Sequence, residues 1–189
     1  MGKKFDPKNA FRLHDERRKK LLPPEETLIS LGLREGMNFI DVGCGSGYFT
    51  LPASKIVGKN GKVYAIDVQQ EMLEILKQNG VPENVVILLA KSDYDFPIED
   101  ETGDFTLCAF VLHENKDPIR FLEEVKRITK TGGKIVILDW KKQVEEWGPP
   151  YEERLSQEEV IKFCKDVKLS IHKYGELNPS HYKVICVKE

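Results

Sequence analysis

Short runs of aliphatic and aromatic residues alternate along the chain with longer segments in which apolar residues recur at helical spacing. The runs predict five β-strands, at residues 38–42, 62–67, 85–90, 105–110 and 135–140. The longer segments predict helices at residues 47–57, 69–79, 118–128 and 156–167. Because the strand runs consist mainly of Val, Ile and Leu, both of their faces should be buried, as in a parallel sheet covered by helices.

The end of the chain has a different pattern. Two further apolar runs, at 168–173 and 181–187, are separated only by residues 174–180. Seven residues cannot hold a crossover helix, so these two strands should be antiparallel. The predicted fold class is therefore α/β: a Rossmann-like, doubly wound sheet of seven strands, mostly parallel, that ends in a C-terminal antiparallel hairpin and occupies residues 23–189.

Two stretches lie outside this pattern. Residues 1–22 are polar and basic, with Phe5, Phe11 and Leu13 as spaced apolar positions, and we expect them to form an N-terminal lid or extension. A helix packed permanently on the sheet, or a frayed tail, is the alternative. Residues 141–155 form a long loop after the fifth strand and contain Trp147 and Tyr151. Long loops in this position tend to be functional, because ligands bind at the carboxyl ends of parallel strands.

Composition narrows the class of protein. The 189 residues carry a formal net charge of -2, which argues against a dedicated nucleic-acid binder. The longest aliphatic run, 85–90, is too short to cross a membrane, and the first residues lack the apolar core of a signal peptide. The cysteines have neither the paired spacing nor the nearby histidines of a metal site: they are Cys44, Cys108, Cys164 and Cys186. We therefore expect a cytoplasmic protein with reduced thiols and no metal.

A glycine-rich turn after the first strand carries the clearest chemical signal. Gly43, Gly45 and Gly47 follow Asp41-Val42, an arrangement that lets backbone amides approach a ligand closely. A dinucleotide fingerprint would need glycine at Tyr48, and the lysine of a phosphate-binding P-loop is missing. The second strand ends in Asp67, where a carboxylate can bind the two hydroxyls of a ribose.

Four successive segments resemble the motifs of class I S-adenosylmethionine-dependent methyltransferases. They are Asp-Val-Gly-Cys-Gly-Ser-Gly at 41–47, Val-Tyr-Ala-Ile-Asp at 63–67, Asp-Phe-Thr-Leu-Cys-Ala-Phe-Val-Leu-His-Glu at 104–114 and Gly-Gly-Lys-Ile-Val-Ile-Leu-Asp at 132–139. The resemblance implies S-adenosylmethionine as the cofactor and residues 38–140 as the core of its site. Relatives often carry an Asp after the third strand, where this chain has Ser92 with Asp93 beside it.

The resemblance also implies roles for individual residues. Around the methionine part of the cofactor we expect Asp41, Gly43, Cys44, Gly45, Gly47, Cys108, Ala109 and Phe110. Around the ribose and adenine we expect Asp67, Val68, Met72, Ser92 and Asp93.

The methyl-transfer site is less strongly determined. His113 follows the fourth strand as the only imidazole expected near the methyl group, as a general base or as a residue that holds a loop. An acceptor wall is expected from Asp139, Trp140, Lys141, Trp147 and Tyr151. An aminopropyl transfer would normally need more acidic residues after the fourth strand than Glu114.

We expect a methyltransferase for a small-molecule acceptor, with no nucleic acid or membrane as partner and with the oligomeric state open. A catalytically inactive S-adenosylmethionine-binding module, serving as a sensor or partner subunit, is the alternative.

Overall fold

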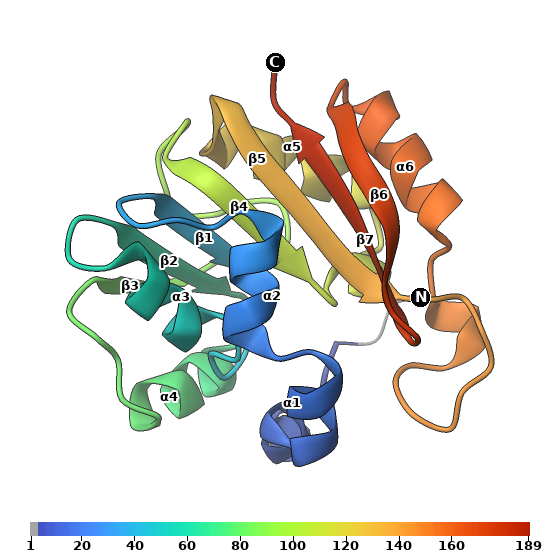
Figure 1. The fold of residues 1–189 in the computed structure, drawn as a ribbon, viewed down its shortest axis with the longest axis horizontal. Coiled ribbons are helices and arrows are strands. Elements are labelled where there is room, and N and C mark those ends of the chain that lie inside the picture. Colours follow the sequence, from blue (N-terminus) through green and yellow to red (C-terminus); the bar gives the residue numbers. More distant parts are fainter. Residues whose placement is uncertain (1–3) are drawn as a thin grey trace.

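The computed structural model describes residues 4–189, except for the side chains of residues 11–14. Seven strands form one sheet in the order β3-β2-β1-β4-β5-β7-β6 (Figure 1). They are β1 (Asn38–Val42), β2 (Lys62–Asp67), β3 (Val85–Leu89), β4 (Gly103–Ala109), β5 (Thr129–Trp140), β6 (Ser170–Asn178) and β7 (His181–Val187). The first five strands pair in parallel, whereas β7 is antiparallel to both β5 and β6. The α/β fold class and the C-terminal antiparallel hairpin are confirmed.

Helices cover both faces of the sheet, as the unbroken apolar strands predict. They are α1 (Glu16–Leu21), α2 (Pro24–Leu31), α3 (Thr50–Val57), α4 (Gln70–Gln78), α5 (Pro118–Ile128) and α6 (Gln157–Asp166). Short 3-10 helices span Pro7–His14 (η1), Leu112–Glu114 (η2) and Tyr151–Glu153 (η3). Buried side chains of α2 and α3 pack on one face of the sheet, and those of α5 and α6 pack on the other.

The structure differs from the sequence prediction mainly in the lengths of elements. β5 begins at Thr129 rather than at 135, because Gly132 and Gly133 continue the pairing through backbone hydrogen bonds with Lys188. β6 extends to Asn178, so only Pro179 and Ser180 separate it from β7. α3 begins at Thr50 because residues 43–49 form a turn.

The strand order creates a crevice at one edge of the sheet. The chain runs outward from β1 through β2 to β3 and then returns to β4, which pairs with the other side of β1. Connections on the two sides of this switch point lead away from each other, which leaves a site at the carboxyl ends of β1 and β4. α1 lies below this edge (Figure 1).

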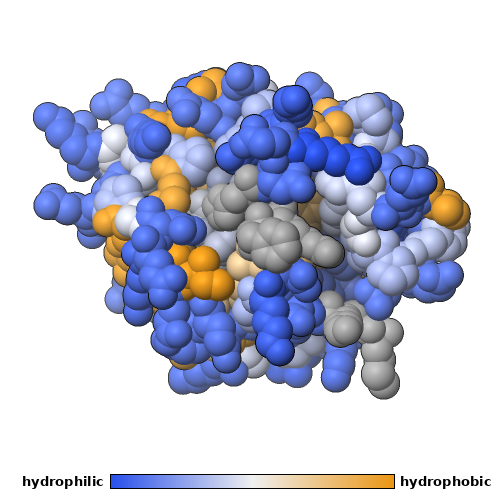
Figure 2. Space-filling model, turned by 90° about the horizontal axis from the view of Figure 1, so that it is seen from below, coloured by the Kyte–Doolittle hydropathy of each residue, from blue (hydrophilic) through white to orange (hydrophobic). Residues whose placement is uncertain are grey.

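The surface seen from that side is mostly hydrophilic, with smaller hydrophobic groups between the polar side chains (Figure 2). Among the described residues, no helix has the length and apolar character needed to span a membrane.

Candidate functional site

A cavity of about 730 Å³ opens at the crevice between β1 and β4. This volume lies in the range of small-molecule and cofactor sites. Eleven residues that the sequence assigns to the site line it: Asp41, Gly43, Cys44, Gly45, Asp67, Val68, Met72, Asp93, Ala109, Phe110 and His113. The motifs at the ends of β1, β2 and β4 therefore converge on one space.

The glycine turn needs a backbone conformation that side chains disfavour. Gly43, Gly45 and Gly47 have φ angles of 70°, 53° and 93°. A Cβ atom at Gly43 would lie 2.1 Å from Cγ1 of Val111, and one at Gly47 would lie 2.4 Å from Cδ1 of Leu76. The amides of Gly43 and Cys44 both donate to the carbonyl of Ile66, which ties the turn to the end of β2. The turn thus presents backbone rather than side chains to the cavity.

Two buried carboxyl groups flank this turn. Asp67 accepts hydrogen bonds from the amides of Gly45 at 2.8 Å and Gln69 at 2.9 Å, one on each oxygen. Each oxygen keeps a second lone pair, so the carboxylate can still accept from the hydroxyls of a ribose. Asp41 accepts from the hydroxyl of Thr50 at 2.7 Å, and burial raises its pKa to about 7. A buried acid beside the glycine turn suits the amino group of a methionine moiety.

Three residues assigned to the cofactor site from the sequence do not line the cavity: Gly47, Ser92 and Cys108. Gly47 faces Leu76 of α4 and serves the turn rather than the ligand. The hydroxyl of Ser92 accepts from the amide of Tyr94, so it is used within its own loop. Cys108 belongs to the hydrophobic core between the sheet and α5, because strand alternation turns it away from the cavity, whereas Ala109 lines it.

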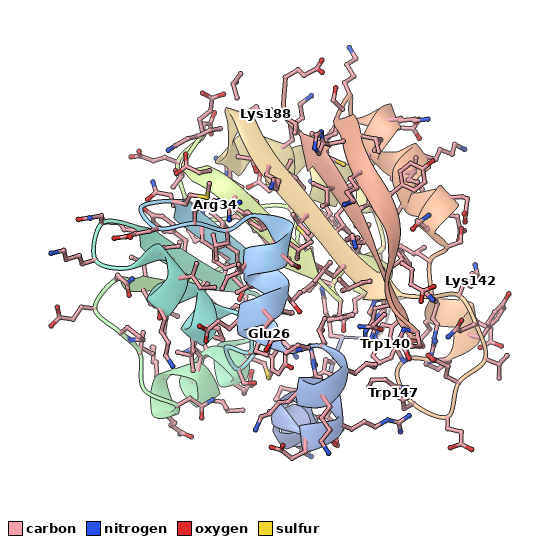
Figure 3. All side chains as sticks on the ribbon, viewed as in Figure 1. Glu26, Arg34, Trp140, Lys142, Trp147 and Lys188 are labelled. Carbon is pink, nitrogen blue, oxygen red and sulfur yellow. The ribbon has the colours of Figure 1, made fainter. Side chains whose placement is uncertain are left out.

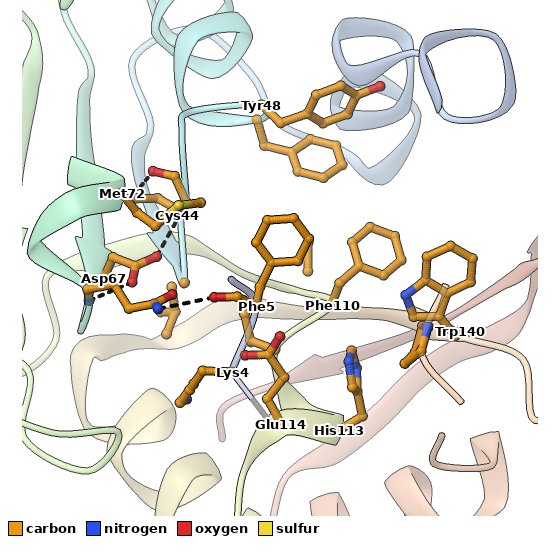
Figure 4. Close-up of a pocket in the computed structure, with 18 of the residues that line it drawn as sticks. Lys4, Phe5, Cys44, Tyr48, Asp67, Met72, Phe110, His113, Glu114 and Trp140 are labelled. Atoms are coloured by element: carbon orange, nitrogen blue, oxygen red, sulfur yellow. Dashed lines mark hydrogen bonds between the residues drawn. The ribbon is translucent and has the colours of Figure 1, made fainter. Parts of the chain in front are cut away.

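His113 is held at the cavity wall by a carboxylate. Its Nδ1 lies 2.7 Å from Oδ1 of Asp139, and its amide donates to the other oxygen of Asp139 at 3.3 Å. Burial lowers the pKa of His113, but the charge and hydrogen bond of Asp139 outweigh burial, so the pKa lies above its usual value of 6.5. Burial raises the pKa of the adjacent Glu114 to about 7. Both side chains project into the cavity (Figure 4). This end of the cavity can therefore accept or hold a proton near neutral pH.

The structure corrects the expectation that His113 is the only imidazole near the reacting group. His181, the first residue of β7, also lines the cavity and is almost fully buried. It pairs across the sheet with Trp140, the last residue of β5. The sequence identifies His181 only as a strand residue, and its position in the site follows from the antiparallel pairing.

The N-terminal segment packs against the cavity. Lys4 forms an ion pair with Asp93 at 2.5 Å, and the carbonyl of Phe5 accepts from the side-chain amide of Gln69 at 3.1 Å. The ring of Phe5 lies in the pocket (Figure 4). The guanidinium of Arg18 lies 4.5 Å from the ring centroid of Tyr48.

Of the three apolar positions predicted to close over the site, Phe5 lines the cavity. The side chains of Phe11 and Leu13 are outside the described residues.

The loop that follows β5 supplies part of the cavity wall. Trp147 lines the cavity next to Trp140, and both lie at the lower end of β5 and β7 (Figure 3). Arg154 is buried and donates to the carbonyls of Lys141, Trp147 and Pro149, which fixes the loop. The expectation for Lys141 and Tyr151 as wall residues is wrong: Lys141 pairs with Glu176, Tyr151 is exposed, and neither lines the cavity. Asp139 acts at the wall through His113.

Comparison with known proteins agrees with this geometry. The family model described as methyltransferase domain matches residues 40–137. A demethylmenaquinone methyltransferase of Staphylococcus aureus is 33% identical over 142 residues, which are 74% of this chain and 56% of that protein. The chain thus spans about half the length of the curated relatives it matches.

Solved structures show the same relationship over nearly the whole chain. A SAM-dependent methyltransferase from Aquifex aeolicus is 38% identical, with a TM-score of 0.92 over 98% of this chain and 100% of that one. A structure described as a type 11 methyltransferase from Sulfolobus solfataricus is 26% identical, with a TM-score of 0.73 over 88% and 92% of the two chains.

The switch-point cavity, the glycine turn and the carboxylate after β2 define an α/β enzyme that binds a nucleoside-containing cofactor. The chain belongs to the methyltransferase domain family, and its class I S-adenosylmethionine-dependent members share its fold. It is an S-adenosylmethionine-dependent methyltransferase. The alternative of an inactive binding module finds no support in these relatives.

Proposed function

We propose that this methyltransferase acts on a small-molecule acceptor, which binds in the same cavity as the cofactor. The observation that carries the proposal is a cavity of about 730 Å³ that combines the glycine turn, the His113–Asp139 pair and an aromatic wall. Residues Lys4 to Arg18 contribute to its lining, so the space is walled on the side away from the sheet. Such an enclosed space suits a small organic molecule better than a macromolecule. The demethylmenaquinone methyltransferases among the relatives are also named after a small molecule, which supports this class of acceptor.

The chain's own residues divide the cavity into two parts. Asp41 and the glycine turn would hold the amino-acid end of S-adenosylmethionine, and Asp67 would hold its ribose. Val68 and Met72 would contact the adenine, with Asp93 at the far end. When bound, the cofactor supplies an electrophilic methyl group on its sulfonium sulfur. The rest of the cofactor is the leaving group, a neutral thioether. Phe110 and His113, after the end of β4, then belong to the side where the acceptor lies.

His113 is the residue proposed to take the acceptor's proton. Its Nδ1 is engaged by Asp139, which leaves Nε2 as the nitrogen for a ligand, and no hydrogen bond to Nε2 occurs within residues 4–189. A base whose pKa lies near the working pH is the most effective proton acceptor. Asp139 orients the ring and stabilises the imidazolium that forms.

The experiment that tests this proposal has two steps. Isothermal titration with S-adenosylmethionine measures cofactor binding, and incubation with a labelled methyl donor and a pool of small metabolites measures transfer. We expect a saturable affinity and a labelled low-mass product. Label that appears only in protein or nucleic acid would contradict the small-molecule acceptor.

A further inference from the structure

Four rings at the acceptor end of the cavity form a compact box. It consists of Phe110, Trp140, Trp147 and His181, and we call it the aromatic box. The ring centroid of His181 lies 4.4 Å from that of Trp140, 4.8 Å from that of Phe110 and 5.8 Å from that of Trp147. All four residues line the cavity. The box comes from the ends of β4, β5 and β7 and from the loop after β5.

His181 is the unusual member of the box. Neither of its ring nitrogens has a hydrogen-bond partner among the described residues, although the side chain is buried. Burial lowers its pKa to about 4, so the imidazole is neutral at physiological pH, with one donor and one acceptor nitrogen. A buried polar group without a partner lowers stability, and such groups are rare in folded proteins. A ligand in the cavity would supply the missing partner.

The backbone at Phe110 supports a functional role for the box. Phe110 has a φ angle of 61°, a left-handed conformation that is costly for an aromatic residue. Its amide still donates to the carbonyl of Leu138 at 2.8 Å, so the strained residue is held in place by β5. Strained backbone conformations of this kind occur frequently at binding sites, where they orient a side chain toward a ligand.

Positive charges already cover the rings of the box. The guanidinium of Arg17 lies 4.5 Å from the centroid of Trp147, and that of Arg18 lies 5.1 Å from that of Phe110. Arg154 lies 5.2 Å from Trp140 and is paired with Glu145. Arg17 and Arg18 have no carboxylate partner for their guanidinium groups in the described part of the chain. The box is therefore less suited to a cationic acceptor than to a neutral or anionic one.

We propose that the aromatic box binds a flat conjugated acceptor that carries a hydroxyl group, and that the imidazole of His181 forms a hydrogen bond with that hydroxyl. The rings supply flat apolar surface for the acceptor, and the positive charge of Arg18 favours an electron-rich oxygen on it. His181 is an acceptor-binding residue in this assignment, distinct from His113, which faces the cavity from the other side of the sheet edge. The inference rests on the proposed function, because it places the acceptor of that reaction.

The test uses the fact that the chain's two tryptophans are both in the box. Their fluorescence reports on a bound coumarin by energy transfer, without any methyl transfer. The probes are 7-hydroxycoumarin, 7-methoxycoumarin, which lacks the hydroxyl proton, and a coumarin of similar size with a trimethylammonium group. Each is titrated into the full chain with saturating S-adenosylhomocysteine. We expect saturable binding of 7-hydroxycoumarin, weaker for the methoxy compound by about three- to tenfold, as for one hydrogen bond, and weakest for the cation.

Two variants assign the effect to His181. His181→Phe keeps a flat ring of similar size but removes both nitrogens, and it should abolish the difference between the hydroxyl and methoxy probes. It should also raise the melting temperature, because the buried unpaired nitrogens are gone. His172→Phe, at an exposed position of β6, is the matched control and should leave the difference between the probes unchanged.

Each outcome decides the proposal. Equal affinity for the hydroxyl and methoxy probes, or a difference that survives in His181→Phe, overturns it. So does a His181→Phe variant that melts at a lower temperature and binds S-adenosylhomocysteine less tightly, since His181 is then structural. Failure of all three probes, with S-adenosylhomocysteine still bound, overturns the box and leaves the proposed function standing. If the wild-type chain does not bind S-adenosylhomocysteine at all, the proposed function itself is contradicted.

Discussion

Nδ1 of His113 lies 2.7 Å from Oδ1 of Asp139, which joins the loop after β4 to the end of β5. Both side chains are nearly inaccessible to solvent. The next residue, Trp140, points to the opposite face of the sheet and packs against His181 at 4.4 Å. Successive residues of one strand thus supply a carboxylate to the proposed base and a ring to the aromatic box.

Asp139→Asn should change the pH dependence of methyl transfer. Asp139 raises the pKa of His113 above 6.5, and a base acts in its neutral form, so activity should rise with pH through this raised pKa. The variant should move the acidic limb of the kcat/KM profile to lower pH and reduce the plateau by about tenfold to a thousandfold. Glu153→Gln, which removes a more distant charge, should shift the limb less. An unchanged profile in Asp139→Asn would give His113 a purely structural role.

Asp67→Asn should weaken cofactor binding with little effect on the fold. Hydrogen bonds to a charged group contribute about 1.5–3 kcal/mol each, so the loss for S-adenosylhomocysteine should be tenfold or more. Isothermal titration measures it, with Asp95→Asn at an exposed position outside the cavity as the matched control. Equal affinities in the two variants would remove Asp67 from the ribose site.

Asp41→Asn should remove a pH dependence from the stability of the fold and from cofactor binding. The pKa of Asp41, about 7, lies above its usual value of 3.8, so the native state binds this proton more tightly than the unfolded chain does. Without ligand, stability should therefore fall as pH rises from about 4 to 7, and the variant should lack this part of the decrease.

Binding of an ammonium group favours the ionised Asp41. The affinity of the wild-type chain for S-adenosylhomocysteine should rise across pH 7, and the variant should bind about tenfold more weakly with a flatter profile. Glu114 titrates near the same pH, so the difference between the two chains is the quantity to measure. Identical profiles would show that another group controls binding.

Gly47→Ala should destabilise the fold through two effects. The residue has a φ angle of 93°, and a Cβ atom would lie 2.4 Å from Cδ1 of Leu76. We expect a loss of about 1–3 kcal/mol in the free energy of unfolding, measured by denaturant titration. Gly132 has a φ angle of 78°, but no atom lies within 4 Å of the Cβ that Gly132→Ala would add. This control variant should therefore lose only about 1 kcal/mol in the free energy of unfolding. In a Leu76→Ala background the extra cost of Gly47→Ala should shrink, and a constant cost would exclude the clash.

The N-terminal segment should become more resistant to protease when the cofactor binds. Arg17 and Arg18 contact rings at the cavity, and a bound ligand adds further contacts beneath them. Tryptic cleavage at residues 17–20 should be slower with S-adenosylhomocysteine, whereas cleavage at the exposed Lys59 and Lys62 should not change. Equal rates at residues 17–20 with and without ligand would contradict a lid at residues 1–22.

The repetition of strand, helix and glycine signals determines most of the fold. Three strands, 38–42, 62–67 and 181–187, match the predicted bounds, because apolar runs end sharply at polar or glycine residues. The cofactor side is predictable for the same reason. Asp41, Asp67 and the glycine turn are local features of strand ends, and parallel strands bring their carboxyl ends to one edge.

The acceptor side was decided by the tertiary structure. Trp140 and His181 are neighbours only because β7 pairs antiparallel with β5 in the register that places these two residues opposite each other. A shift of β7 by one residue would turn the ring of His181 to the other face of the sheet, away from Trp140. The left-handed backbone of Phe110 likewise has no local signal, since only its packing against β5 and α1 maintains it. The motifs in the sequence therefore indicate the cofactor through their resemblance to those of known methyltransferases, whereas long-range strand pairing decided which side chains line the proposed acceptor side.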